Sequence, residues 1–221
     1  MSVWAVLAAA GRGERLGLDR PKAFARLRER PLLAESLERL EATSWVESIV
    51  VIAPPGWEEP AILLAEELGC GKVVSCVTGG DTRAEAVRSG VAEVADDATA
   101  VVVHDAARPL VTDAVVERVL KRVAEGWDGA VPALPLADTV KRVRANEVVE
   151  TVDRSELVAV QTPQAFEASV LRQALRGDVA SASDCASLVE AQRGRVAVVE
   201  GDPALFKITS PADLELVERF L

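Results

Sequence analysis

The 221-residue sequence has no tyrosine, one methionine, one histidine and three cysteines. The cysteines form no C-x-x-C pair, and with a single histidine they make a poor ligand set for zinc. We therefore expect reduced, buried thiols rather than disulfides or a metal centre. A lone histidine, here His104, is more typical of a hydrogen-bonded structural residue than of a catalyst, and we assign it no chemistry.

The sequence also lacks long apolar runs, internal repeats and low-complexity linkers. No apolar run approaches the roughly 20 residues of a membrane-spanning helix. No basic segment precedes the first apolar run, so we expect no signal peptide. The net charge of −10 repels nucleic-acid backbone and anionic membranes, but it permits a small anionic ligand in a local basic pocket. These features predict a cytoplasmic protein with neither nucleic acid nor membrane as a partner.

Uniformly apolar segments alternate with amphipathic ones along a chain that is 49% hydrophobic. The pattern predicts strands at 3–9, 48–53, 72–77, 100–104 and 196–199, and helices at 31–43, 57–69, 82–94, 113–125, 167–175, 184–192 and 211–220. Strands that are apolar on both sides are typical of a parallel sheet covered on both faces. We expect one α/β domain over residues 1–221, with a Rossmann-like, mostly parallel sheet and helices on both faces.

The alternation of strands and helices is interrupted after residue 128. Short strands are expected at 129–135, 139–143 and 148–152, with turns but no helix between them. Paired strands of this kind predict a β-hairpin arm, at about residues 135–156, that protrudes from the sheet. Further along, we expect a strand at 158–161 and a short β segment at 204–206 that ends at Lys207.

The first predicted strand leads into a glycine-rich loop, residues 8–17, which is followed by Pro21 and Lys22. Small residues let backbone N–H groups approach phosphate oxygens. A dinucleotide fingerprint would need glycine where Leu16 stands, and no Gly-Lys-Ser/Thr triplet of a Walker A loop is present. Arg15 and Lys22 remain, two cations that suit a bound polyphosphate. The alternative is a sharp turn with solvated side chains.

Seven motifs in order along nearly the whole chain resemble the nucleotidyltransferases that join an NTP to a sugar or polyol phosphate. Within that group the resemblance is to the 2-C-methyl-D-erythritol 4-phosphate cytidylyltransferases of the non-mevalonate isoprenoid pathway. The motifs are the loop 8–15 with Pro21-Lys22, then 79–83 (GGDTR), 104–109 (HDAARP), 138–141 (DTVK), 151–154 (TVDR), 161–164 (QTPQ) and 207–209 (KIT).

The resemblance implies a CTP site built from two loops. Arg15 and Lys22 would act in catalysis, holding the triphosphate and stabilising its developing charge. The implied nucleotide-binding residues are Ala9, Ala10, Gly11, Gly13, Gly79, Gly80, Asp81 and Arg83. Arg83 is equally compatible with a charge on the helix surface. Mg²⁺ is implied as the cofactor, bound mainly through the CTP phosphates and not through a set of protein ligands.

The second substrate implied by the resemblance is a polyol phosphate. Asp105, Thr139 and Thr162 would bind it, while Arg154 and Lys207 would act in catalysis by positioning its phosphate. Thr139 and Arg154 would come from the arm of a second subunit, so a homodimer is implied. Three alternatives stay open: Asp105 as the cap of the next turn, Lys207 as a surface lysine beside a helix start, and the arm residues as exposed side chains.

The sequence departs from the family pattern at two positions. Ala86 stands where the family usually has a serine that contacts the nucleotide, which removes one hydrogen bond. Cys185 stands where the family has an acidic residue, so we leave its loop out of the catalytic set. Ser183 keeps a hydroxyl that we expect to cap the following helix.

The implied reaction transfers CMP from CTP to 2-C-methyl-D-erythritol 4-phosphate, by in-line attack of the substrate phosphate on the α-phosphorus. It gives 4-diphosphocytidyl-2-C-methyl-D-erythritol and pyrophosphate. Two alternatives remain. A cytidylyltransferase for ribitol 5-phosphate would have similar loops, and a non-catalytic nucleotide-binding module would bind CTP without turnover.

Overall fold

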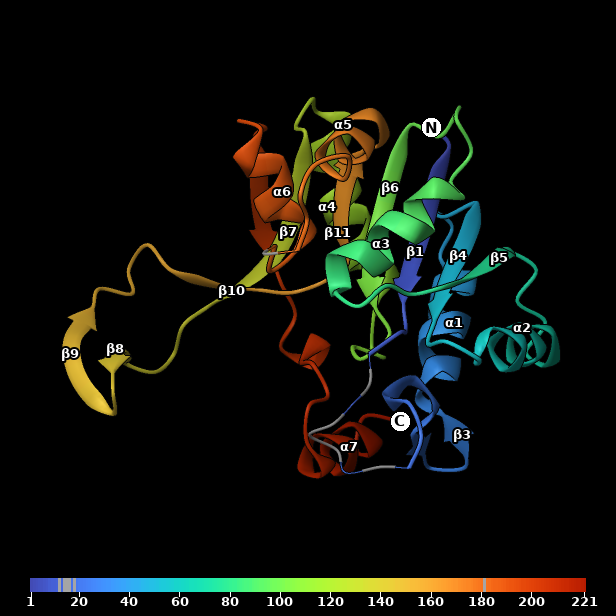
Figure 1. The fold of residues 1–221 in the computed structure, drawn as a ribbon, viewed down its shortest axis with the longest axis horizontal. Coiled ribbons are helices and arrows are strands. Elements are labelled where there is room, and N and C mark those ends of the chain that lie inside the picture. The colour runs from blue at the N-terminus through green and yellow to red at the C-terminus, as the bar shows by residue number, and fades with distance from the viewer. Residues whose placement is uncertain (12, 14–16, 18, 181) are drawn as a thin grey trace.

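The computed structural model describes residues 1–11, 13, 17, 19–180 and 182–221. In this part of the chain, a central sheet of eight strands carries helices on both of its faces (Figure 1). The strand order is β10-β7-β11-β6-β1-β4-β5, with β12 on the other side of β7. The bounds are β1 Val3–Ala8, β4 Ser48–Ala53, β5 Val73–Thr78, β6 Ala100–Asp105, β7 Gly129–Pro135, β10 Val158–Val160, β11 Gln164–Glu167 and β12 Val196–Glu200.

Most neighbouring strands of the sheet are parallel. Strand β1 pairs in parallel with β4 and β6, β4 with β5, and β12 with β7. The carboxyl ends of β1, β4 and β6 therefore meet at one edge of the sheet, which is where ligands bind in open α/β folds. The predicted α/β class and the mostly parallel sheet are confirmed.

Alternating side chains divide the interior into two cores. On β1, Ala5 and Leu7 face one core while Val6 faces the other, as the two-residue period of a strand requires. The first core is closed by α1 (Leu32–Ala42), α2 (Glu58–Glu67) and α4 (Asp113–Ala124). The second is closed by α3 (Arg83–Ala92), α5 (Ala168–Ala174) and α6 (Cys185–Ala191). None of the helices in the described ranges is both long and apolar enough to cross a membrane.

Strand β11 was not expected from the sequence. It lies antiparallel between β6 and β7, in a segment where we predicted the start of a helix. The helix begins one residue later, because the Glu167 side chain accepts hydrogen bonds from the backbone N–H groups of Ser169 and Val170. At the next helix, Asp184 and not Ser183 is the N-cap: its carboxylate accepts from the Ser187 N–H.

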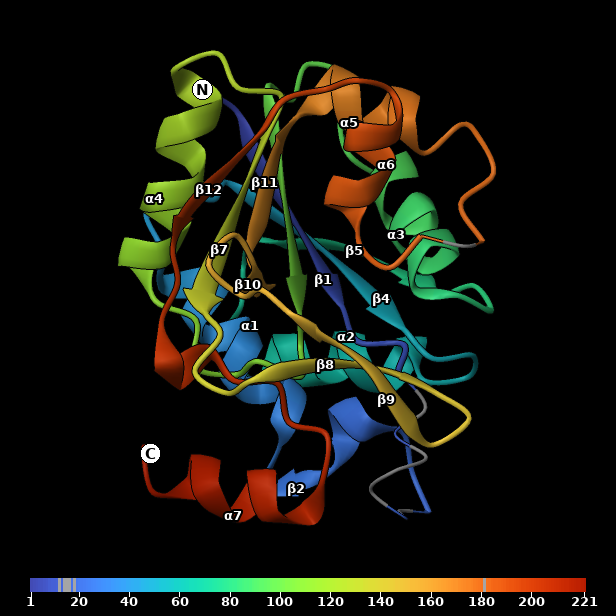
Figure 2. The ribbon, with the colours of Figure 1, turned by 90° about the vertical axis from the view of Figure 1, so that its left-hand side faces the viewer.

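The predicted hairpin arm is confirmed as β8 (Val140–Arg144) paired antiparallel with β9 (Glu147–Val152). Both views show the arm extending from the side of the sheet, away from the body of the protein (Figures 1 and 2). Val143, Val148 and Val149 on the arm are each about half exposed. Apolar side chains held in water in this way mark a surface that a partner would cover.

A small layer lies below the carboxyl edge of the sheet (Figure 1). It contains η2 (Lys22–Phe24), the hairpin β2 (Arg26–Leu27) with β3 (Arg30–Pro31), η3 (Pro203–Leu205) and α7 (Pro211–Glu218). Leu27, Ile208 and Val217 pack together inside this layer. Our prediction of a β segment at 204–206 is wrong: the Asp202 carboxylate accepts from the Ala204 N–H and starts a 3-10 turn instead.

Candidate active site

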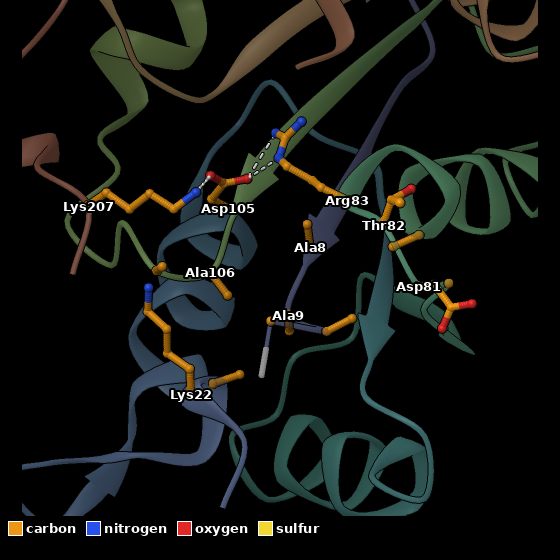
Figure 3. A pocket seen from close by; sticks show the side chains of 15 residues that line it. Ala8, Ala9, Lys22, Asp81, Thr82, Arg83, Asp105, Ala106 and Lys207 are labelled. Carbon is orange, nitrogen blue, oxygen red and sulfur yellow. Dashed lines mark hydrogen bonds and ion pairs between the residues drawn. The ribbon is translucent and has the colours of Figure 1, made fainter. Parts of the chain in front are cut away.

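A cavity of about 380 Å³ opens at the carboxyl ends of β1 and β6 (Figure 3). It is bounded by the loop after β1, the loop between β5 and α3, the loop after β6, and the segment that follows η3. Its lining residues are Ala8, Ala9, Ala10, Gly11, Lys22, Ala23, Gly80, Asp81, Thr82, Arg83, Ala86, Asp105, Ala106, Ala107 and Lys207. Segments from opposite ends of the sequence thus build one site.

Two of the predicted nucleotide-binding glycines are positions of close packing. A Cβ atom on Gly79 would overlap the side chain of Ala10, so the first and second loops touch edge to edge. A Cβ on Gly80 would lie 2.5 Å from the Cβ of Glu85, at the first turn of α3. Glycine is needed at both positions because any side chain would force the walls of the cavity apart.

Lys22 reaches the cavity from η2, where Pro21 holds the preceding backbone extended at φ −58°. Gly13 has φ +69°, and a Cβ there would lie 2.7 Å from the Cβ of Lys22. The lysine side chain rises along the cavity wall toward Ala106 (Figure 3). Arg15, the other predicted catalytic residue of this loop, lies outside the described residues. The geometry therefore supports a phosphate contact at Lys22.

The N-terminus of α3 also faces the cavity. Thr82 and Glu85 form a capping box, in which each side chain accepts a hydrogen bond from the backbone N–H of the other residue. This cap fixes the direction in which Arg83 leaves the helix. Thr82 was missing from our sequence-based site, although the Thr-x-x-Glu spacing after Asp81 was a readable signal.

Asp105 lies at the centre of the site, between two cations (Figure 3). Its Oδ1 is 3.0 Å from Arg83 Nε and 2.9 Å from Arg83 Nη2, and its Oδ2 is 2.7 Å from Lys207 Nζ. Burial alone would raise the pKa of the Asp105 carboxyl, but the charges of Arg83 and Lys207 outweigh it and hold that pKa well below its usual range. The carboxylate is therefore ionised throughout the physiological pH range.

This arrangement decides between the alternatives that the sequence left open. Arg83 is not a surface charge of α3, because its guanidinium turns inward to Asp105. The Asp105 carboxylate bonds to side chains and does not cap the next turn; its backbone oxygen accepts from the Arg108 N–H instead. Lys207 also turns toward the cavity rather than into solvent beside α7.

Thr162, a predicted substrate-binding residue, is buried behind the cavity and is not part of its lining. Its Oγ1 accepts a hydrogen bond from the Asp105 backbone N–H at 3.0 Å and lies 3.1 Å from Nδ1 of His104. His104 Nε2 lies 3.0 Å from the carbonyl oxygen of Arg108, which can only accept. In neutral His104 the proton is thus on Nε2, and Thr162 donates to Nδ1. The threonine hydroxyl orients Asp105 through this network.

Because the chain has one histidine, this network makes a clear spectroscopic prediction. Burial lowers the pKa of His104 to about 4, against the opposing charge of Asp105. The imidazole NMR signals of the folded protein should therefore stay constant between pH 8 and pH 5. Since unfolded chains bind the proton near pH 6.5, the unfolding free energy should fall by about 3 kcal/mol as pH drops from 6.5 to 4. A titration midpoint near 6.5 in the folded state would contradict the burial of a neutral ring.

Both departures from the family pattern border the cavity. Ala86 lines it directly, as an apolar methyl group beneath Gly79. Cys185 is fully buried, and its Sγ is 3.9 Å from Nη1 of Arg83. Burial raises the pKa of the Cys185 thiol to about 11, although the Arg83 charge opposes this, so the thiol is neutral at physiological pH. Arg83 consequently has its carboxylate contact at Asp105.

Thr139 and Arg154 are not brought to this cavity by their own chain. They flank the arm, with Thr139 just before β8 and Arg154 just after β9, and both are exposed. The Arg154 guanidinium donates to the backbone oxygen of Ala137, which holds it at the base of the arm. One chain therefore presents two parts of the predicted site on separate surfaces, the cavity and the arm.

Within the described ranges, no group of three or more histidine, cysteine, aspartate or glutamate residues is arranged to hold a metal ion. Both oxygens of Asp105 are engaged by cations. Asp81 is an exposed carboxylate at the rim of the cavity. This donor set fits a divalent ion that is carried by the phosphates of a ligand, and not a metal centre made by the protein.

Comparison with known proteins agrees with this geometry. Residues 3–221 match the family model described as IspD, 2-C-methyl-D-erythritol 4-phosphate cytidylyltransferase. The curated enzyme of that name from Nocardia farcinica is 46% identical over 221 residues, covering 100% of this chain and 94% of the relative. The one from Saccharopolyspora erythraea is 44% identical, covering 100% of both chains.

A solved structure extends the similarity to three dimensions. The crystal structure of 2-C-methyl-D-erythritol 4-phosphate cytidylyltransferase from Thermus thermophilus is similar with a TM-score of 0.80 and 35% identity, covering 100% of this chain and 98% of that one. The agreement of family model, sequence relatives and fold over the full length leaves one assignment: the chain belongs to the 2-C-methyl-D-erythritol 4-phosphate cytidylyltransferase family, and it is a nucleotidyltransferase.

Proposed function

We propose that the protein transfers CMP from CTP to 2-C-methyl-D-erythritol 4-phosphate, releasing pyrophosphate. The observation that carries the proposal is that Lys22, Arg83 and Lys207 line one cavity at the carboxyl edge of the sheet. In a protein of net charge −10, this local concentration of cations suits two phosphorylated reactants. The family membership supplies the identity of those reactants.

The nucleotide is placed in the half of the cavity between the β1 loop and α3. The closely packed backbone around Gly79 and Gly80 supports a narrow wall for a pyrimidine ring, with Asp81 at its rim. Lys22, together with Arg15, would hold the triphosphate and stabilise the negative charge that grows on the leaving pyrophosphate. Mg²⁺ bound to the triphosphate would neutralise part of the same charge.

The polyol phosphate is placed in the half of the cavity beside Lys207. Its phosphate oxygen is already ionised, so the in-line attack on the α-phosphorus needs no protein nucleophile or general base. Lys207 would orient the attacking phosphate, and Asp105 would align Lys207 and Arg83 between the two substrates. Catalysis then comes from positioning and from neutralisation of charge.

Arg154 would complete this half of the site from a second subunit. The exposed valines on the arm support a homodimer in which the arm of each protomer crosses to its partner. Arg154→Ala should raise KM for the polyol phosphate by about 10–100-fold, the cost of one charge-assisted hydrogen bond, and should leave CTP affinity unchanged. Steady-state kinetics with each substrate varied in turn measures this.

Mixed dimers show whether Arg154 acts in its own chain or in its partner. Arg154→Ala and Lys207→Ala protomers, each nearly inactive alone at low concentrations of the polyol phosphate, are mixed and allowed to exchange subunits. If the arm crosses, one site of each heterodimer contains both intact residues, and about a quarter of wild-type activity returns at equal mixing. No recovery after confirmed exchange would place Arg154 in the site of its own chain.

The reaction itself is tested by measuring pyrophosphate release from CTP and Mg²⁺ with each polyol phosphate in turn. We expect multiple turnovers with 2-C-methyl-D-erythritol 4-phosphate. Turnover with ribitol 5-phosphate alone would assign the protein to that substrate. Binding of CTP without release of pyrophosphate in either case would indicate a nucleotide-binding module, and the proposed reaction would be wrong.

A further inference from the structure

Gln161 is a buried polar residue of the QTPQ motif that the proposed reaction does not use. It follows β10 directly, is 5% exposed, and its backbone N–H donates to the carbonyl oxygen of Pro132 at 2.7 Å. Its side-chain amide pairs with the backbone of Asp202: Nε2 donates to the Asp202 carbonyl oxygen at 2.8 Å, and Oε1 accepts from the Asp202 N–H at 3.0 Å. The amide therefore pairs with that backbone as a neighbouring strand would.

The neighbouring backbone is shaped to admit this side chain. A Cβ atom on Gly201 would overlap Oε1 of Gln161 and would lie 3.0 Å from the backbone carbonyl carbon of Ala133. The Gly201 N–H donates to the Ala133 carbonyl oxygen at 2.9 Å, which continues the line of β12. The chain thus has the one residue type at 201 that leaves room for both contacts.

The paired backbone leads directly to Lys207. The Asp202 carboxylate caps η3, and Lys207 lies two residues beyond the end of that turn. On the other side of the segment, Arg108 Nη1 donates to the Leu205 carbonyl oxygen at 2.5 Å, and the Ile208 N–H donates to the Ala107 carbonyl oxygen at 2.9 Å. These bonds connect residues 201–208 to β10 at one end and to the loop after β6 at the other.

We propose that Gln161 is a positioning residue for the polyol-phosphate half of the site: its paired hydrogen bonds fix the start of η3 and thereby the point from which Lys207 reaches the cavity. The inference rests on the proposed role of Lys207. It differs from a general contribution to stability because the nucleotide half is built from the loops after β1 and β5, on the far side of β6 from Gln161. Loss of the pair should therefore affect one substrate and not the other.

Gln161→Glu tests the pair with a side chain of the same shape. As a carboxylate, the substituted side chain keeps the acceptor for the Asp202 N–H but places a second oxygen against the Asp202 carbonyl, and the two repel. As a carboxylic acid it donates to that carbonyl and restores both bonds. Burial and a facing carbonyl favour the protonated form, so the defect should weaken within an accessible acidic range.

Gln161→Met is the matched variant without a titratable group, and it removes both hydrogen bonds at every pH. Taking each variant relative to wild type cancels the titration of Asp202, Asp105 and the substrates, which all three proteins share. Gln192→Glu makes the same substitution on the exposed end of α6 and should behave as wild type.

We expect Gln161→Glu to raise KM for the polyol phosphate about tenfold or more at pH 8, with CTP affinity by calorimetry within about twofold of wild type. The ratio should decline toward one as pH is lowered to 5.5, whereas the ratio for Gln161→Met should stay high and flat. Equal losses for both substrates, failure of both variants to bind CTP, or a pH-independent ratio for Gln161→Glu would overturn the inference. Lys207→Ala is measured alongside, since an unchanged KM there would refute the proposed role of Lys207 itself.

Discussion

Lys22→Ala is expected to lower kcat by about 10²–10³-fold while the protein remains folded. The side chain lines the cavity and starts the short turn η2, but the apolar packing of that layer comes from its neighbours Ala23 and Phe24, which are buried. Removal of the ammonium group takes away charge stabilisation that grows with the developing negative charge of the leaving pyrophosphate. The effect should therefore appear in kcat more than in KM.

Steady-state kinetics and a thermal melt on the same preparation test this prediction. Lys121→Ala, which removes a lysine from the exposed side of α4, is the matched control and should be silent in both assays. Turnover within a fewfold of wild type for Lys22→Ala would remove this lysine from the catalytic set. A large drop in melting temperature would assign it a structural role instead.

Asp105→Asn is expected to damage activity and stability together. The substitution keeps the shape of the side chain but leaves the partly buried cations Arg83 and Lys207 without their shared carboxylate. Loss of one partner from a buried ion pair destabilises proteins by about 3–5 kcal/mol, which for this length corresponds to a melting temperature lower by about 10 °C. Because both cations also lose their alignment, turnover should fall by about 10²-fold or more.

The pH dependence of the stability loss identifies its cause. The pKa of Asp105 is depressed in the folded state, so its ion pairs contribute fully above the unfolded value near 3.9 and are lost as pH falls further. The difference in unfolding free energy between wild type and Asp105→Asn should thus be constant from pH 8 to about pH 4.5 and shrink below that. Asp97→Asn, on an exposed loop, is the control. Equal stability of Asp105→Asn and wild type would contradict the ion-pair account.

The elements that the sequence predicted well are those with strong local signals. Segment 48–53 is a run of apolar residues whose bounds as a strand agree with β4, and the helix ending near residue 43 follows from leucines spaced along one face. The hairpin arm was predictable because its turns and short strands contain no helical periodicity. In each case neighbouring residues carry the information.

The errors arise where distant contacts override local pattern. Gln164 to Glu167 pair as a strand because β6 and β7 leave a gap in the sheet that this segment fills, which no local signal announces. The 3-10 turn at η3 depends on one side chain, Asp202, whose own backbone is held by Gln161 from 41 residues away. Single-sequence patterns do not contain such pairings.

The candidate site was predicted residue by residue but not as a network. Glycine, arginine and lysine in loops after strands were readable as phosphate contacts, and Lys22, Arg83 and Lys207 do share a cavity. That Asp105 would bond to two of these cations was not readable, because Arg83 and Lys207 lie 22 and 102 positions from it in the sequence. Thr162 was expected to face substrate, and its burial behind Asp105 follows from the unexpected strand beside it.

The central claim is that both phosphorylated substrates meet in the cavity between Lys22 and Lys207. A crystal structure of the protein with CTP and Mg²⁺ tests it most directly. The account predicts the triphosphate against Lys22, the cytosine against the backbone at Gly79 and Gly80, and an α-phosphorus open to attack from the side of Lys207. Nucleotide density at any other surface, with this cavity empty, would contradict it.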